Sequence, residues 1–151
     1  MLKEGNPAPG FSLKDAEGKA HSLSQFAGRT LVLYFYPADD TPGCTVEACE
    51  FRDAEKKIEA KGAVVVGVSK DAPESHAKFS KKFGLKFLLL SDPKLEAIKA
   101  YGAWGRKKFM GREFDGVLRT TFVIGPDGRL KKIFRGVTPK GHAAQVLEAV
   151  A

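Results

Sequence analysis

The sequence predicts an α/β fold, a sandwich in which helices cover a central mixed β-sheet. Two runs, Thr30–Tyr36 and Ala63–Ser69, are almost wholly apolar and β-prone, which is typical of strands buried on both faces. A helical stretch follows each of them, which favours a βαβ arrangement. Toward the end of the chain, Arg119–Ile124 and Leu130–Phe134 flank Gly125–Gly128, which predicts an antiparallel hairpin in the same sheet.

The remaining elements are predicted in chain order from apolar periodicity and capping residues. Short alternating segments before residue 30 predict a first hairpin and one helical turn. In order, the expected elements are strands at 11–13 and 20–22, a turn at 23–26, a helix at 44–60, a helix that begins at 71 or 73 and ends at 83, a strand at 87–90, and helices at 94–101 and 140–150. We expect residues 102–116 to form a loop whose aromatic side chains, led by Trp104, pack in the core or as a lid.

Composition predicts one domain spanning residues 1–151, with 43% hydrophobic and 28% charged residues and no linker or repeat. The net charge of +7 permits an acidic partner, but the positive residues are scattered and no nucleic-acid motif accompanies them. No run is long enough to cross a membrane, and no apolar run follows the first charged residues. We therefore expect a cytoplasmic protein that binds neither nucleic acid nor membrane.

The chain has two cysteines, Cys44 and Cys49, and their spacing argues against a structural role. A bridge across five positions closes a very small loop and restricts the unfolded chain little. A zinc site needs about four ligands, and the three histidines have no ligand spacing. Redox chemistry is the interpretation that remains.

Cys44 lies where a buried strand gives way to a helix, after Thr41 and Pro42, which resemble a cap and a first helical residue. Unpaired amides and the helix dipole favour an anion there, so we expect an ionised and exposed sulfur at Cys44. Nucleophilic attack by such a sulfur also needs donors for the negative charge that develops on the leaving atom. The Thr41 hydroxyl and the amides of Gly43 and Cys44 are candidates.

The run Pro37–Thr45 resembles the Pro-x-x-x-Thr/Ser-x-x-Cys signature of peroxiredoxins, and Val46–Asp53 resembles their Q-type branch, also called bacterioferritin-comigratory proteins. The resemblance continues through Trp104–Lys108 and Arg119–Phe122 and covers essentially the whole chain. It implies a thioredoxin-like fold with an N-terminal β-hairpin extension. It also implies reduction of hydrogen peroxide and organic hydroperoxides, with electrons from thioredoxin or a similar dithiol, in antioxidant defence.

The same resemblance implies a role for each residue of the site. Cys44 would be the peroxidatic residue and Cys49 the resolving one, Thr41 and Arg119 would position the peroxide, and Pro37 would shield the thiolate. Taken singly, each residue also has a purely structural interpretation. Thr41 could serve as a cap, Pro37 could end a strand, Arg119 could lie on the surface, and Cys49 could be a small buried hydrophobe.

The spacing of the two cysteines does not allow a disulfide between them while the helix is intact. On an intact helix their Cα atoms lie ~8.7 Å apart, and their side chains point ~140° apart around the axis. A disulfide needs less than about 7 Å, so oxidation must unwind one or two turns after Pro42. Because both cysteines are in one chain, we expect a monomer. We expect no metal, nucleotide or flavin, since no phosphate-binding glycine pattern is present.

Two other functions remain open on the sequence. A thioredoxin-type oxidoreductase would carry Cys-x-x-Cys, whereas this chain has four residues between its cysteines, and no proline precedes Thr120. A redox switch that passes oxidation to a partner would share the chemistry of Cys44. Catalytic turnover of peroxide distinguishes an enzyme from such a switch.

Overall fold

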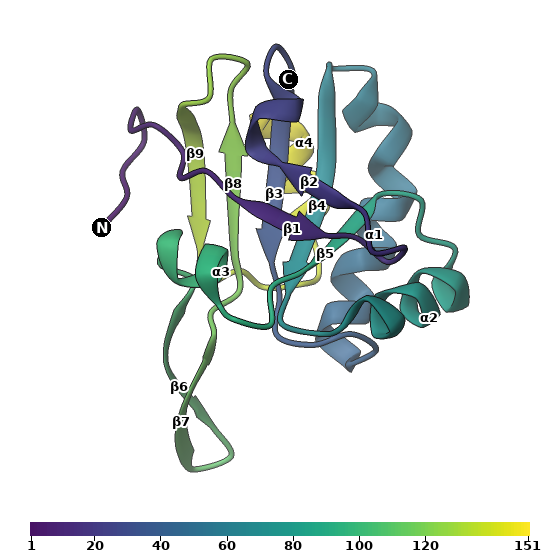
Figure 1. Ribbon diagram of the computed structural model, residues 1–151, viewed down its shortest axis with the longest axis vertical. Coiled ribbons are helices and arrows are strands. Elements are labelled where there is room, and N and C mark those ends of the chain that lie inside the picture. Colours follow the sequence, from purple (N-terminus) through teal and green to yellow (C-terminus); the bar gives the residue numbers. More distant parts are fainter.

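A computed structural model describes all 151 residues, and in it one seven-stranded mixed sheet runs through the molecule (Figure 1). The strands follow the order β2-β1-β5-β4-β3-β8-β9, and β3 is parallel to β4 and antiparallel to β8. The strands of this sheet are β1 (Ser12–Lys14), β2 (Ala20–Ser22), β3 (Thr30–Phe35), β4 (Ala63–Ser69), β5 (Leu88–Ser91), β8 (Thr120–Ile124) and β9 (Leu130–Arg135). The predicted mixed sheet and N-terminal hairpin are confirmed.

Helices cover the sheet because its two faces are both apolar. In β3, alternate side chains point to opposite faces, so Val32 and Tyr34 belong to one core and Leu31 and Leu33 to the other. The first core is closed by the three longer helices, and the second by the shorter helical segments and the N-terminal strands. The helical elements are the 3₁₀ turn η1 (Leu23–Phe26), α1 (Pro42–Glu59), α2 (Pro73–Phe83), α3 (Glu96–Ala100) and α4 (His142–Ala149).

The helix boundaries follow the signals in the sequence with one exception. Pro42 opens α1, and Gly84 ends α2 in the left-handed conformation with φ 64°, both as predicted. The predicted helix over residues 94–101 is shorter than expected, because Leu95 has φ 61° and α3 begins only at Glu96. The Asp92 carboxylate caps α3 by accepting hydrogen bonds from the amides of Glu96 and Ile98. None of the helices is long and apolar enough to cross a bilayer.

The expectation of a loop over residues 102–116 is wrong. This segment forms a separate two-stranded antiparallel hairpin of β6 (Trp104–Phe109) and β7 (Arg112–Val117), which projects from the body of the molecule (Figure 1). Trp104 is half-buried and packs against the second core as expected. Phe109 and Phe114, by contrast, are exposed and belong to neither core.

Candidate active site

Cys44 is the third residue of α1, at the edge of the sheet where β3 ends. The β3 strand is buried along its length, and the segment from Pro37 to Thr41 turns the chain into the helix. The first helical hydrogen bond runs from the Thr45 amide to the Thr41 carbonyl, at 2.8 Å. The amides of Gly43 and Cys44 therefore have no backbone partner and remain available to an anion.

Cys44 is 1% exposed, which corrects the expectation of an exposed sulfur. Its side chain belongs to the first hydrophobic core, because position 44 lies on the same helix face as Ala48 and Phe51. A peroxide can thus meet the sulfur only within a site from which bulk water is largely excluded. Burial also makes electrostatic contacts at the sulfur stronger than they would be in water.

Arg119 is the charged group that touches this sulfur. The strand register pairs Phe35 at the end of β3 with Thr120 at the start of β8, and this brings Arg119 to the same edge as Cys44. Arg119 Nη2 donates a hydrogen bond to Cys44 Sγ at 3.4 Å. A Cβ atom at Gly43 would lie only 3.2 Å from Nη2, so the absence of a side chain there allows the guanidinium to approach.

Glu47 is a site residue that the sequence analysis missed. Its Oε1 accepts a 2.7 Å hydrogen bond from Arg119 Nη1, so one guanidinium joins the carboxylate to the sulfur. Glu47 is 1% exposed and its Oε2 has no partner. Burial raises the pKa of Glu47 to about 7, although the adjacent Arg119 opposes the shift. An acid three residues after Cys44, on an otherwise apolar helix face, was the available signal.

The predicted contacts of Thr41 and Pro37 differ from that of Arg119. Thr41 occupies the cap position of α1, but its hydroxyl donates to the Ala38 carbonyl at 2.9 Å and caps no amide. No hydrogen bond joins Thr41 to Cys44, and its hydroxyl oxygen can still accept one. Pro37 is half-buried directly after β3 and Tyr36. The structure therefore brings Arg119 and Gly43 against Cys44, while it places Thr41 and Pro37 in the segment leading to it.

A buried polar network holds that segment in place. Asp39 Oδ2 accepts hydrogen bonds of 2.7 Å from both His76 Nδ1 and Ser75 Oγ, and its Oδ1 accepts one of 2.6 Å from the Tyr36 hydroxyl. His76 Nε2 donates to the Leu90 carbonyl at 3.0 Å. Burial alone would raise the pKa of Asp39, but its donors outweigh burial and lower it. The segment before Cys44 is thus fastened to α2 and β5.

Cys49 lies five residues along the same helix and is half-buried, whereas Cys44 is fully buried. Both thiols are free, and α1 is unbroken from Pro42 to Glu59. At helical spacing their Cα atoms are ~8.7 Å apart, too far for a disulfide. Arg52, one turn further along, donates to the Phe83 carbonyl at 2.7 Å and ties the middle of α1 to the end of α2. Any opening of α1 between the cysteines therefore leaves its second half anchored.

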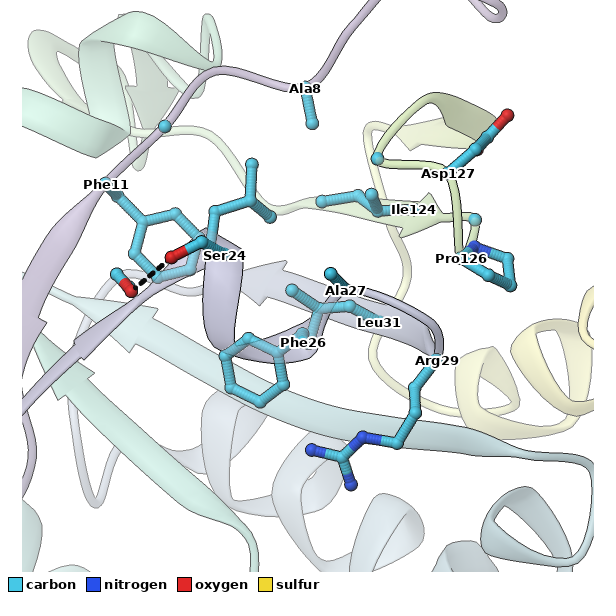
Figure 2. Close-up of a pocket in the computed structure, with 15 residues that line it drawn as sticks. Ala8, Phe11, Ser24, Phe26, Ala27, Arg29, Leu31, Ile124, Pro126 and Asp127 are labelled. Atoms are coloured by element: carbon cyan, nitrogen blue, oxygen red, sulfur yellow. Dashed lines mark hydrogen bonds between the residues drawn. The ribbon is translucent and has the colours of Figure 1, made fainter.

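A hollow of about 430 Å³ lies at the opposite end of the sheet, where β3 begins and β8 ends (Figure 2). Phe11, Leu31 and Ile124 line it, and the Arg29 guanidinium lies over the Phe26 ring at 5.7 Å. Its walls carry no cysteine or histidine. This hollow therefore offers no thiol or imidazole, and the nucleophile of the candidate site is Cys44 at the other edge.

A free cysteine at a helix start, bound by an arginine on a thioredoxin-like sheet, is an arrangement suited to thiol-dependent peroxide reduction. Residues 5–133 match the model of the AhpC/TSA family, and the chain belongs to this family. Peroxiredoxin Bcp of Bacillus subtilis is 44% identical over 149 residues, covering 99% of this chain and 95% of the relative. Peroxiredoxin Bcp of Escherichia coli is 41% identical over 146 residues, covering 97% and 94%.

Solved structures agree with these relatives. The bacterioferritin comigratory protein of Xanthomonas campestris has a TM-score of 0.88 and 36% identity, covering 93% of this chain and 89% of that chain. A cysteine-to-serine mutant of PrxQ from Xylella fastidiosa has a TM-score of 0.92 and 34% identity, covering 98% and 94%. The protein is therefore an enzyme with a thioredoxin-like fold, a thiol peroxidase of the Bcp/PrxQ group of peroxiredoxins.

Proposed function

We propose that Cys44 is the peroxidatic residue and Cys49 the resolving residue of a single-domain enzyme that reduces hydrogen peroxide and organic hydroperoxides. The observation that carries the assignment is the Arg119–Cys44 contact of 3.4 Å at a helix N-terminus with free amides. Positive charge and aligned donors stabilise a thiolate, and the thiolate is the nucleophile. The alkyl peroxide reduction described for the Xanthomonas campestris protein supports including organic hydroperoxides.

In the first step the Cys44 thiolate attacks one peroxide oxygen and the O–O bond breaks. The sulfur becomes a sulfenic acid, and the other oxygen leaves as water or an alcohol after taking up a proton. Negative charge grows on the leaving oxygen, so donors that are already in place lower the barrier. Arg119 and the Gly43 and Cys44 amides fit this role, and the Thr41 oxygen can accept a hydrogen bond from the incoming peroxide. Pro37 would limit access of water to the thiolate.

In the second step the Cys49 thiol condenses with the sulfenic acid, which forms a disulfide and releases water. The first turns of α1 must open for this. Gly43, Thr45 and Val46 are mediocre helix formers, which keeps the cost of opening low. A dithiol protein such as thioredoxin then returns two electrons to the disulfide. Since both cysteines are in one chain and free, we propose a monomer that works in the cytoplasm.

Peroxide consumption with a thioredoxin system tests these roles in the wild type, Cys44→Ser and Cys49→Ser. We expect no activity from Cys44→Ser. Cys49→Ser should still oxidise once at Cys44 but form no intramolecular disulfide, which mass spectrometry of the intact chain would detect. Peroxide turnover by Cys44→Ser equal to that of the wild type would disprove the assignment.

Amide hydrogen exchange tests the opening of α1. The oxidised enzyme should lose protection at amides 45 to 50, which are the hydrogen-bonded amides between the cysteines, and keep it beyond Arg52, where the helix is tied to Phe83. Equal protection of the reduced and oxidised forms over this segment would exclude the proposed unwinding.

A further inference from the structure

The β6–β7 hairpin carries most of the large apolar side chains that the molecule exposes. Phe109 is 66% exposed, Met110 87% and Phe114 43%, and outside the hairpin only Met1 and Val46 are comparable. The hairpin projects from the edge of the sheet at which β3 ends (Figure 1). A cluster of exposed apolar side chains on a soluble surface commonly marks an interaction site.

The two faces of the hairpin differ in charge. Side chains alternate between faces, and the register pairs Lys107 with Phe114 and Phe109 with Arg112. These four residues share what we call the Lys107 face, which carries two cations, two aromatic rings and no acid. The opposite face is balanced internally, because Arg106 lies 3.4 Å from Asp115 and 3.9 Å from Glu113. The Lys107 face is therefore the apolar and uncompensated side.

The Lys107 face also borders the active site. Lys107 is half-buried, and its stem lies over Gly116, where a Cβ would meet its Cδ at 3.0 Å. Burial and the charge of the Arg119 guanidinium lower the pKa of Lys107. The charge of Cys44 opposes this shift by favouring the protonated form of Lys107. β7 ends at Val117, two residues before Arg119, so the base of the hairpin adjoins the residue that contacts Cys44 Sγ. A molecule that covered this face would lie at the edge of the sheet that carries Cys44.

The turn at the tip has a sequence that folding alone does not favour. Phe109 pairs with Arg112, so Met110 and Gly111 form a two-residue turn with φ values of 52° and 79°. Such turns favour Asn or Asp followed by Gly, because the first residue must also be left-handed. A methionine there costs stability and exposes an apolar side chain. Local strain of this kind concentrates at functional positions.

We propose that the Lys107 face and the Met110 tip form the docking surface for the dithiol protein that reduces the oxidised enzyme. This rests on the proposed function, since each turnover then requires a second protein to reach the disulfide. Its thiolate attacks one sulfur and releases the other as a thiolate; its second thiol then breaks the mixed disulfide, and two electrons have passed. The chemistry of the face requires a partner with acidic side chains around an apolar patch near its reactive thiol.

A protein fits this surface better than a lipid bilayer does. Phe114 lies on the flank of the hairpin and faces the same side as Lys107, so the apolar surface runs along the hairpin toward Cys44. A bilayer could accept Phe109 and Met110 at the tip, but not the flank that continues to the catalytic edge. Exposed Phe, Met and Arg side chains are also those enriched at protein interfaces.

The sharpest test is Met110→Asn, assayed with a bacterial thioredoxin kept reduced by its reductase. We expect the KM for thioredoxin to rise about 10-fold, as for a substantial interface contact. Turnover with dithiothreitol and the single-turnover oxidation of Cys44 by peroxide should be unchanged. The thermal midpoint should rise, because Asn tolerates the left-handed turn better than Met. A gain in stability with a weaker interaction cannot come from a damaged fold.

A pair of charge reversals tests the electrostatic part. Arg112→Glu on the Lys107 face should raise the KM for thioredoxin above the wild-type value. Lys131→Glu on β9 makes the same change in net charge and should leave the KM unchanged. The wild-type KM should increase with ionic strength. Equal effects of the two reversals, or an unchanged KM in Met110→Asn, would overturn the proposal. The proposal would also be overturned if the wild type floated with anionic phospholipid vesicles and Met110→Asn did not, while the KM for thioredoxin was the same in both. That result would show that the tip binds a bilayer. If the wild type did not reduce peroxide with dithiothreitol as the electron donor, the proposed function itself would be refuted.

Discussion

Cys44 is 1% exposed and Met110 is 87% exposed, although both belong to segments at the edge of the sheet where β3 ends. The cysteine is surrounded by the first core, and the residues leading to it are fastened by a buried hydrogen-bond network. The hairpin has no core of its own; beyond its base, where Trp104 and Val117 pack against the second core, it presents its apolar side chains to water. Under the proposals above, chemistry is performed by groups that the fold fixes from several directions, and recognition of the reductant is left to a segment that the fold constrains less.

The largest expected effect is the loss of stability on breaking the buried hydrogen-bond network that holds the segment before Cys44. His76→Leu removes the main donor of Asp39, a carboxylate whose side chain is 4% exposed. Removing one hydrogen-bond donor of a buried carboxylate costs about 1–3 kcal/mol of unfolding free energy, because the Asp39 charge stays buried with fewer donors. Guanidinium denaturation measures the loss. Lys82→Met is the matched control, since it breaks an exposed ion pair with Asp40 in the same segment and should cost less than about 1 kcal/mol. Similar costs for the two would contradict the network's role.

Arg119→Met should have the next largest effect, mainly on the rate of the chemical step and secondarily on stability. It removes the donor at 3.4 Å from Cys44 Sγ, and loss of one such donor commonly slows a reaction ~10²–10³-fold. The second-order rate constant for peroxide, measured by competition with a haem peroxidase, reports this step alone.

Two further variants interpret the Arg119 result. In Arg119→Met alone, the Glu47 carboxyl stays buried and unpaired. The double variant Arg119→Met/Glu47→Gln removes this carboxyl, so it should react as slowly as Arg119→Met but unfold at a higher denaturant concentration. Arg106→Met on the exposed hairpin should stay within about twofold of the wild type, because Arg106 is screened by water. A normal rate in Arg119→Met would remove the arginine from the mechanism.

Glu47→Gln tests whether burial governs the site's charge. The pKa of Glu47 is about 7 in the folded chain and 4.5 is its ordinary value, so between these pH values the native state holds the extra proton. Wild-type stability should therefore fall as pH rises from 4.5 to 7, relative to Glu47→Gln. At 1.36 kcal/mol per pH unit the difference is at most about 3 kcal/mol. Denaturant midpoints at pH 5, 6 and 7.5 measure it, and parallel pH profiles would contradict it.

The sequence predicts the fixed region well, because its signals are local. Apolar runs mark β3 and β4, and Pro42 places Cys44 in the first turn of a helix. The pairing of Glu47 with Arg119 is not local, since 72 positions separate them and only the register of β3 with β8 joins them. The residue–residue contacts of a buried site therefore follow from tertiary structure, and the family resemblance supplied Arg119 where local patterns could not.

The hairpin escaped prediction for the opposite reason. Its strands carry charged and exposed side chains without apolar alternation, and its turn is Met-Gly where Asn-Gly would have been recognised. Local preference thus conflicts with the observed structure at Met110. A conflict of this kind is expected where a residue is kept for binding and not for folding.

Gly43→Ala should have the smallest effect and sharpens the comparison most, because it separates stability from activity at one position. Gly43 is in the first turn of α1 without a positive φ, so Ala should stabilise the helix by no more than about 1 kcal/mol. Its Cβ would lie 3.2 Å from Arg119 Nη2 and must displace the guanidinium by a few tenths of an ångström. We expect a higher thermal midpoint and a peroxide rate constant reduced about 3- to 10-fold, since small displacements of a positioned donor are costly. A rate equal to that of the wild type would mean that the arginine need not approach the helix so closely.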